Sequence, residues 1–138
     1  MSLHYLDTSA ALKLLRAEEH STAMAAFYDK AVAEGHRFAS SDLLRIELLR
    51  AVTRADPQLL PEARALLTAI STIEIDEEIV QAAGNETDRM LHTLDAIHLA
   101  SARAFGADLT TLLTYDERLA QAAKDAGIPA RIVTADGP

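Results

Sequence analysis

The sequence predicts an α/β fold with a short-stranded, mainly parallel central sheet flanked by helices on both faces. Short β-like runs alternate along the chain with helical segments that are too long to be hairpin loops. Strands joined through helices run parallel, and the helices then cover both faces of the sheet. The chain has 138 residues, of which 49% are hydrophobic, so it can bury one core, and we expect a single domain over 1–138.

The expected elements follow one another without a linker, a repeat or a low-complexity segment. In order, they are a strand at 4–6, two helices between 9 and 35, a strand at 37–40, helices at 43–55 and 61–70, a strand at 71–75, helices at 76–84 and from 93 to near 106, a strand at 110–115, a helix at 116–127 and a strand at 130–133. The strand at 71–75 alternates polar and apolar residues, which is typical of a half-buried strand.

The helix boundaries come from residues that favour helix ends. Ser41 and Asp42 both offer N-caps for the helix at 43–55, which must stop before Pro57. Pro61 suits the first turn of the helix that follows. Glycines stand at or just past the ends of other expected helices, at Gly35, Gly84, Gly106 and Gly127.

The composition excludes several classes of function. The net charge of −8 argues against binding nucleic acid through a broad basic surface, but it is compatible with an enzyme that holds phosphates through metal ions. The absence of cysteine removes disulfides, thiolate catalysis and thiolate metal sites. No apolar run approaches membrane-spanning length, and the first residues lack the pattern of a signal peptide. We therefore expect a soluble, cytoplasmic protein with no membrane partner.

Two aspartates each follow a predicted strand and open a predicted helix. Asp7 comes after the strand at 4–6, and Asp116 comes after the strand at 110–115. Ligands of open α/β sheets bind beyond the carboxyl ends of the strands, which is where both carboxylates would lie. The competing interpretation of each residue is a simple N-cap, because aspartate is a favoured capping residue.

Two further acids lie inside predicted helices. Asp95 stands in "TLDAIHLASA", where apolar residues occupy most of the helix circumference and leave only a thin polar stripe. A buried carboxylate without a partner is costly, so the alternative to a functional role is a hydrogen bond to His98 or His92. Glu47 lies in the middle of its helix, and its alternative role is an intrahelical pair with Arg50.

A single site would explain all four acids together. Carboxylates converging at ~4 Å would repel one another by about 4 kcal/mol per pair at an effective dielectric near 20, so the cluster needs protons or cations. Oxygen ligands without cysteine favour Mg²⁺, or Mn²⁺, over structural zinc. Such ions cleave phosphodiesters by activating the attacking water and, where a second ion is present, by steadying the leaving oxygen. The predicted catalytic residues and metal ligands are Asp7, Glu47, Asp95 and Asp116.

Four sequence blocks also carry a family resemblance that spans almost the whole chain. They are "YLDTSAALKLL", "SSDLLRIELLRAVTR", "LHTLDAIHLASA" and "LLTYDERLAQAAKDAGI". In this order and approximate spacing, the chain resembles the PIN-domain ribonucleases, and most closely the VapC-type toxins of type II toxin–antitoxin modules. Matched residue by residue, the acidic site of the family falls on Asp7, Glu47, Asp95 and Asp116.

The resemblance implies a single PIN-like domain over 1–138 and a Mg²⁺- or Mn²⁺-dependent endoribonuclease that hydrolyses phosphodiester bonds in RNA, usually tRNA or rRNA. It also implies a cognate VapB-type antitoxin whose C-terminal segment wraps the toxin and occludes its site. We expect the protein to form a homodimer as well.

Three further residues are candidates for supporting roles. Ser9 and Thr114 stand near the first and fourth acids, where a hydroxyl could bond a neighbouring carboxylate; the alternative is an ordinary hydroxyl at a helix start or strand end. His92 occupies a position where close relatives usually have arginine, and that position could hold substrate or orient the site. His98 is expected to be a hydrogen-bond partner of a carboxylate and not a metal ligand.

Two other functions compete with a nuclease. The alternative is a PIN-fold binding module without nuclease activity, which would act through protein or RNA partners. Replacement of one of the four acids would favour that module, but all four are present. A haloacid-dehalogenase-like phosphatase would need a second aspartate two residues after Asp7, and Ser9 stands there instead.

Overall fold

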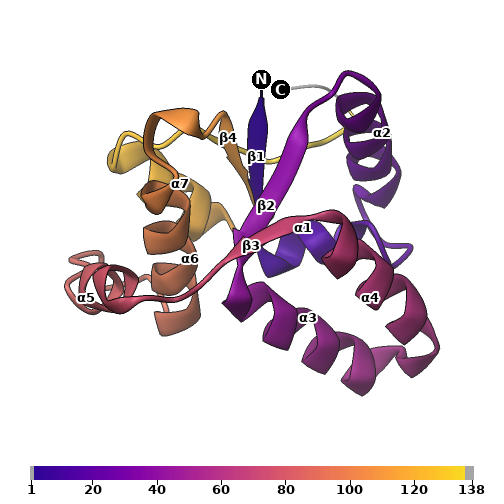
Figure 1. Ribbon diagram of the computed structural model, residues 1–138, viewed down its shortest axis with the longest axis horizontal. Helices are drawn as coiled ribbons and strands as arrows, with labels where there is room; N and C mark the ends of the chain where they lie inside the picture. The colour runs from indigo at the N-terminus through magenta and orange to yellow at the C-terminus, as the bar shows by residue number, and fades with distance from the viewer. Residues whose placement is uncertain (1, 136–138) are drawn as a thin grey trace.

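A five-stranded parallel sheet forms the centre of the protein (Figure 1). The computed structural model describes residues 2–135. The strands are β1 (Leu3–Leu6), β2 (Arg37–Ser41), β3 (Ser71–Ile73), β4 (Thr111–Leu113) and β5 (Ala130–Arg131), and they lie in the order β3-β2-β1-β4-β5. Every neighbouring pair is parallel. The predicted α/β class and short parallel strands are therefore confirmed.

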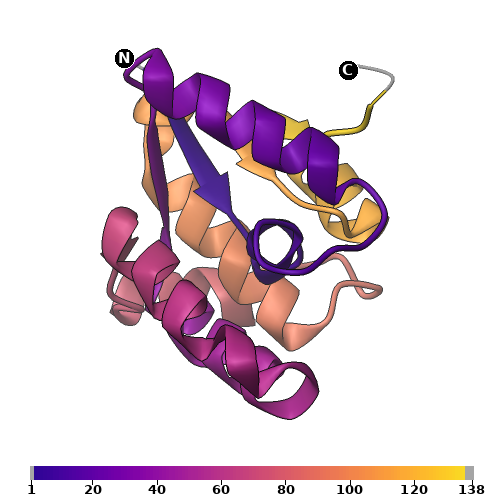
Figure 2. The ribbon, with the colours of Figure 1, turned by 90° about the vertical axis from the view of Figure 1, so that its right-hand side faces the viewer.

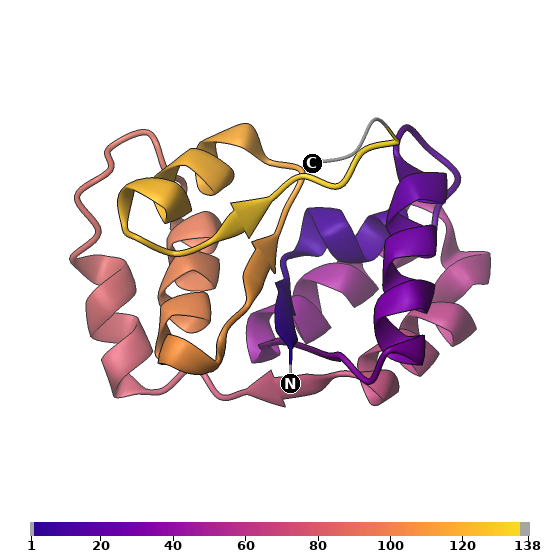
Figure 3. The same cartoon turned by 90° about the horizontal axis from the view of Figure 1, so that it is seen from above.

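Helices cover both faces of this sheet. They are α1 (Thr8–Lys13), α2 (Ser21–Ala33), α3 (Asp42–Ala55), α4 (Leu60–Ala69), α5 (Glu77–Gly84), α6 (Thr93–Ala104) and α7 (Glu117–Asp125), with short 3₁₀ turns at Pro57–Leu59 and Gly106–Asp108. Helices α1 to α4 lie on one side of the strands, and α5 to α7 lie on the other (Figure 3). Figure 2 looks onto the first group, with α1 seen end-on between α2 above and α3 and α4 below.

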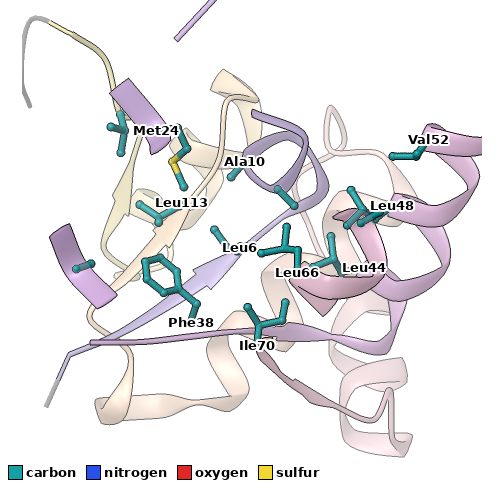
Figure 4. Close-up of a cluster of buried hydrophobic side chains, with 14 residues drawn as sticks. Leu6, Ala10, Met24, Phe38, Leu44, Leu48, Val52, Leu66, Ile70 and Leu113 are labelled. Atoms are coloured by element: carbon teal, nitrogen blue, oxygen red, sulfur yellow. The ribbon is translucent and has the colours of Figure 1, made fainter. Parts of the chain in front are cut away.

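Alternation along the strands divides the apolar side chains between two cores. In β1, Leu6 packs into the cluster under α1 to α4, whereas Tyr5 packs into the cluster under α6 and α7. In β4, Leu113 and Leu112 divide in the same way, as the two-residue period of a strand requires. Figure 4 shows the first cluster, which joins the strands to α3 and α4. Apolar contacts on both faces thus hold the carboxyl ends of β1 and β4 in fixed positions.

Several strands are shorter than the sequence predicts. β3 ends at Ile73 and β5 at Arg131, instead of residues 75 and 133. β4 covers Thr111–Leu113 instead of 110–115, so two residues separate it from Asp116. The Thr114 amide still donates to the Arg131 carbonyl (3.2 Å), but the amides of Tyr115 and Asp116 bond to side chains of the site described below. Within residues 2–135, no helix is both long enough and apolar enough to cross a bilayer.

A buried histidine lies at the opposite end of β1 from that site. His4 bonds through Nδ1 to the Thr111 hydroxyl (2.7 Å) and through Nε2 to Nδ1 of His36 (3.0 Å). Its ring contacts Phe27 and Phe38, with centroid distances of 5.2 and 5.1 Å. Burial, and then the charge of His36, lower the pKa of His4 from 6.5 to about 4. His4 is therefore neutral in the folded protein at neutral pH.

Acidification is expected to destabilise the fold through His4. The unfolded chain binds a proton at this residue near pH 6.5, whereas the folded protein binds it only near pH 4. The contribution of neutral His4 to the free energy of unfolding is thus fully present above pH 6.5. It falls as the pH drops toward 4, by up to about 1.4 kcal/mol per pH unit for one proton. The free energy of unfolding can be measured in urea at several pH values. Its slope against pH should be smaller in His4→Asn, by up to the amount that one proton contributes. An unchanged slope would contradict the assignment.

Candidate active site

We call the region around the carboxyl ends of β1 and β4 the acidic edge of the sheet. It lies where the strand order reverses direction. The chain moves from β1 outward through β2 to β3 and then returns to β4 on the other side of β1. In open α/β sheets, such a reversal leaves a crevice at the carboxyl ends of the two adjacent strands. The Asp7 amide donates to the Leu113 carbonyl (3.2 Å), which joins the two strand ends directly. Asp7 follows β1 and Asp116 follows β4, so this edge collects both residues.

Asp7 is a buried carboxylate and also the N-cap of α1. Its side chain is 3% exposed. It accepts hydrogen bonds from the Ala10 amide (2.9 Å), the Ser9 hydroxyl (2.7 Å) and the Thr114 hydroxyl. Burial raises the pKa of Asp7, while the charge of His98 and these hydrogen bonds oppose the increase. The N-cap interpretation is correct, but it does not account for a carboxylate that is buried against two hydroxyls.

Ser9 and Thr114 connect Asp7 with the loop that follows β4. The Tyr115 amide donates to the Ser9 hydroxyl (2.8 Å), and the Asp116 amide donates to the Thr114 hydroxyl (3.0 Å). These bonds replace sheet pairing beyond Thr114, which explains why β4 does not extend to residue 115. The predicted position of Ser9 and Thr114 beside the first and fourth acids is observed, and their role in the reaction stays a prediction.

Asp116 is the N-cap of α7 and uses one of its oxygens for that purpose. Oδ1 accepts from the Arg118 amide (2.9 Å) and the Leu119 amide (3.1 Å). Oδ2 has no hydrogen-bond partner among residues 2–135. Capping and a second role are therefore compatible at this residue, because one carboxylate oxygen stays available.

Asp95 lies in the first turn of α6 and is the acid without a partner. Its side chain makes no hydrogen bond within the described part of the chain, so the alternative to a functional role, a bond to His98 or His92, is not observed. Burial raises the pKa of Asp95, and the negative charges of Asp116 and Asp7 raise it further, against the opposing charges of His98 and His92. Asp7 and Asp116 therefore both act electrostatically on Asp95.

A hollow of ≈ 510 Å³ opens beside Asp95 and Asp116. It is lined by Met90, His92, Asp95, Asp116, Glu117 and Arg118. His92 is exposed at the N-terminus of α6 and makes no capping hydrogen bond through its side chain. Its predicted position next to the third acid is observed, and its role stays a prediction. Arg118, whose Nη1 donates to the Met90 carbonyl (3.4 Å), is a cation at this hollow that the sequence reasoning missed. Its position two residues after Asp116 was the available signal.

Glu47 does not make the intrahelical pair with Arg50 that was the alternative to a role in the site. It pairs instead with Nε2 of His98 (2.7 Å) and accepts from the Thr8 hydroxyl (2.6 Å). Burial opposes ionisation of Glu47, but the hydrogen bonds from His98 and Thr8 and the charge of His98 outweigh it and lower the pKa. Glu47 is therefore held ionised, and it is joined to the edge through Thr8, the residue that follows Asp7. The side chain of Arg50 is exposed, where its charge is hydrated.

The polar stripe of α6 faces the interior of the protein. His98 is 2% exposed and Ser101 is fully buried, whereas Leu94 is 47% exposed. The ring of His98 reaches across to the Tyr5 hydroxyl, 2.7 Å from Nδ1. Tyr5 and Thr8 were not predicted to contribute to the site, although both stand within "YLDTSA" next to Asp7. The stripe thus connects the acidic edge to the core.

The donor set of this edge fits a hard divalent cation by its chemistry. All four acids supply oxygen, and the negative charges of Asp116 and Asp7, which add to burial in raising the pKa of Asp95, are what such a cation would neutralise. Among residues 2–135, however, no group of three or more His, Cys, Asp or Glu side chains is already close enough to hold a metal. Binding would therefore require the carboxylates to approach one another.

Comparison with known proteins places the chain in one family. A family model described as "PIN domain" matches residues 4–125. Ribonuclease VapC35 of Mycobacterium tuberculosis is 41% identical over 122 residues, which cover 87% of this chain and 89% of that protein. Ribonuclease VapC46 of the same species is 36% identical over 128 residues, which cover 93% of this chain and 95% of the relative.

A solved structure shares the fold at low sequence identity. It is described as the crystal structure of VapBC2 from Rickettsia felis bound to a DNA fragment from their promoter. The TM-score is 0.72 at 15% identity, over 94% of this chain and 97% of that one. The sheet with its acidic edge, the family model and the relatives agree, and the chain belongs to the PIN-domain family.

Proposed function

We propose that the protein is a Mg²⁺-dependent endoribonuclease toxin, with Mn²⁺ as an alternative ion, that hydrolyses phosphodiester bonds in RNA. Asp7, Glu47, Asp95 and Asp116 are its proposed metal ligands and catalytic residues, with Ser9, Thr114 and His92 in support. The expected substrates are tRNA or rRNA. The relatives named above support this proposal because they are ribonucleases and align over most of both chains.

The observation that carries the proposal is the state of Asp95. This carboxylate has no hydrogen bond within residues 2–135, and burial, followed by the negative charges of Asp116 and Asp7, raises its pKa. A structural carboxylate would have a hydrogen-bond donor or a cation beside it. An acid that repels its neighbours and lines an open hollow is typical of a cation site instead.

Each residue of the edge can contribute in a distinct way. Bound Mg²⁺ would activate water and neutralise charge on the phosphate. Asp7 is fixed by three hydrogen bonds and has the least freedom to move, so it defines the position of the site. Asp95 and Asp116 each have an oxygen without a partner among the described residues, and Arg118 is a cation at the same hollow for an RNA phosphate.

The proposed partners follow from the relatives. The fold neighbour contains VapB together with VapC, so we expect a VapB-type antitoxin to bind this protein and to occlude the acidic edge. A homodimer and a cytoplasmic location are further parts of the proposal. Copurification with the product of an adjacent small reading frame would test the antitoxin assignment.

Divalent metal is expected to be required for cleavage and to stabilise the protein. With EDTA, cleavage of total RNA should stop, and added Mg²⁺ or Mn²⁺ should restore it at the same mapped 5′ ends. Thermal unfolding should shift upward with metal, since a ligand at 100 times its Kd adds about 2.7 kcal/mol to the stability of the native state. Cleavage that persists in EDTA would contradict metal dependence. RNA binding without any cleavage would identify a binding module instead.

A further inference from the structure

The two hydrogen bonds to Glu47 converge on one of its oxygens. Oε1 accepts from the Thr8 hydroxyl (2.6 Å) and from Nε2 of His98 (2.7 Å). Oε2 has no hydrogen-bond partner among residues 2–135. The Glu47 side chain is 19% exposed, so it is neither free in solvent nor sealed in the core. One carboxylate oxygen is anchored and the other is left available.

His98, which holds Oε1 of Glu47, is itself held by a hydrogen bond on the other side of its ring. His98 is 2% exposed, and its Nδ1 lies 2.7 Å from the Tyr5 hydroxyl. Tyr5 is fully buried in β1 and donates to the Ser41 hydroxyl at the end of β2 (3.3 Å). The two rings also pack edge to face, with their centroids 5.7 Å apart. His98 therefore connects the strands of the sheet to a glutamate on α3.

We propose that His98 is a positioning residue that, together with Thr8, aims Oε2 of Glu47 into the acidic edge, and that Tyr5 fixes the ring of His98. This inference rests on the proposed function, because it gives Glu47 a metal to face. His98 acts through Glu47 and touches neither metal nor RNA.

The physical reason is the freedom of a glutamate side chain. Fixing a free glutamate side chain in one conformation costs side-chain entropy. If two donors already hold Oε1, the native protein has met this cost before metal binds, and metal affinity is higher. Outer partners that orient a metal ligand typically change affinity by about 10–100-fold when they are removed.

Two substitutions of His98 separate positioning from packing. In His98→Gln, the amide nitrogen can stand near the place of Nε2 and still donate to Glu47, while the bond to Tyr5 is lost. In His98→Asn, the shorter amide stands near Nδ1 and can bond Tyr5, while the bond to Glu47 is lost. The probe is Mn²⁺ binding to the metal-free protein, measured by the EPR signal of free Mn²⁺. We expect about 10-fold weaker binding for His98→Asn and binding close to that of the original protein for His98→Gln.

Thr8 provides a second test that leaves the buried histidine in place. Thr8→Val keeps the shape of the side chain and removes one donor to Oε1, so it should weaken Mn²⁺ binding by several-fold. Thr111→Val is the matched control, because it removes a threonine hydroxyl from another histidine, His4, at the far end of the sheet. That control should bind Mn²⁺ like the original protein. In a Glu47→Gln background, Thr8→Val should have no further effect on binding.

The outcomes distinguish this inference from the proposed function. If the original protein neither binds Mn²⁺ nor cleaves RNA, the proposed function fails and the inference fails with it. A different result would overturn only the inference and leave the proposed function standing. In that case the original protein binds Mn²⁺ and cleaves RNA, but His98→Asn and His98→Gln bind Mn²⁺ equally. The same conclusion holds if Thr8→Val still weakens Mn²⁺ binding in the Glu47→Gln background. If circular dichroism shows that the His98 variants are unfolded, the comparison of Thr8→Val in the original protein and in the Glu47→Gln background decides in the same way.

Discussion

Replacing Asp95 by asparagine is expected to abolish metal-dependent RNA cleavage and to leave the fold intact. The substitution keeps the size of the side chain but removes the charge that lies in the field of Asp7 and Asp116. A metal ion contributes several kcal/mol to stabilising the transition state. Loss of about 4 kcal/mol would lower kcat/KM by about three orders of magnitude. The measurement is cleavage of a mapped RNA site by purified protein in Mg²⁺, and unchanged cleavage would contradict the assignment.

The same variant is expected to melt at a higher temperature without metal. The pKa of Asp95 is raised by folding, so its ionised form costs stability at neutral pH. This cost is absent below the ordinary aspartate value of about 4, where the side chain is protonated in both states. The difference in Tm between Asp95→Asn and the original protein should therefore grow as the pH rises from about 4 to about 7. A lower Tm for the variant would indicate a structural role.

Asp7→Asn is expected to lower cleavage by a similar factor, about three orders of magnitude. The variant separates the two roles of Asp7, because asparagine caps helices as well as aspartate does. The side-chain oxygen of the new asparagine could still accept from the Ala10 amide, which now donates to Oδ1 of Asp7. Burial raises the pKa of Asp7, so removing the charge should not lower stability. Asp29→Asn, an exposed position on α2, is the matched control and should cleave RNA normally.

The opposite pattern would contradict the catalytic role of Asp7. If Asp7→Asn unfolded at a lower temperature yet cleaved RNA at the original rate, Asp7 would be a helix cap alone. Circular dichroism and the mapped cleavage assay on one protein sample give both quantities.

Much of the fold and the four candidate acids of the edge could be predicted from the chain alone. The alternation of short strands and helices was sufficient for a parallel sheet, and the known geometry of such sheets placed Asp7 and Asp116 at one edge. The poorly hydrated charge of Asp95 and the position of Glu47 inside its helix pointed to the same site, and the resemblance to PIN-domain proteins assigned the family's acidic site to the same four residues. Local patterns carried this information because the period of a strand or a helix, and an aspartate that follows a strand, are visible within a few consecutive residues.

The pairing of Glu47 could not be predicted in this way. Its partner His98 is 51 residues distant in sequence, and the contact exists only because α3 and α6 meet at the edge of the sheet. The helical spacing of Glu47 and Arg50 suggested a local pair instead, but such an exposed pair contributes only about 0.2–0.5 kcal/mol. A buried histidine is a stronger partner because both groups are shielded from water there. The end of β4 was missed for the same reason, since it depends on bonds to Ser9 and Thr114.

The most direct test of a metal site at this edge is the anomalous difference map of crystals soaked in Mn²⁺. We predict a peak at the carboxyl ends of β1 and β4, within about 2.0–2.3 Å of carboxylate oxygens from Asp7, Asp95 and Asp116 and of Oε2 of Glu47. The Oε1 bonds to His98 and Thr8 should persist. A peak elsewhere, or crystals without one at a Mn²⁺ concentration that restores RNA cleavage, would contradict the account.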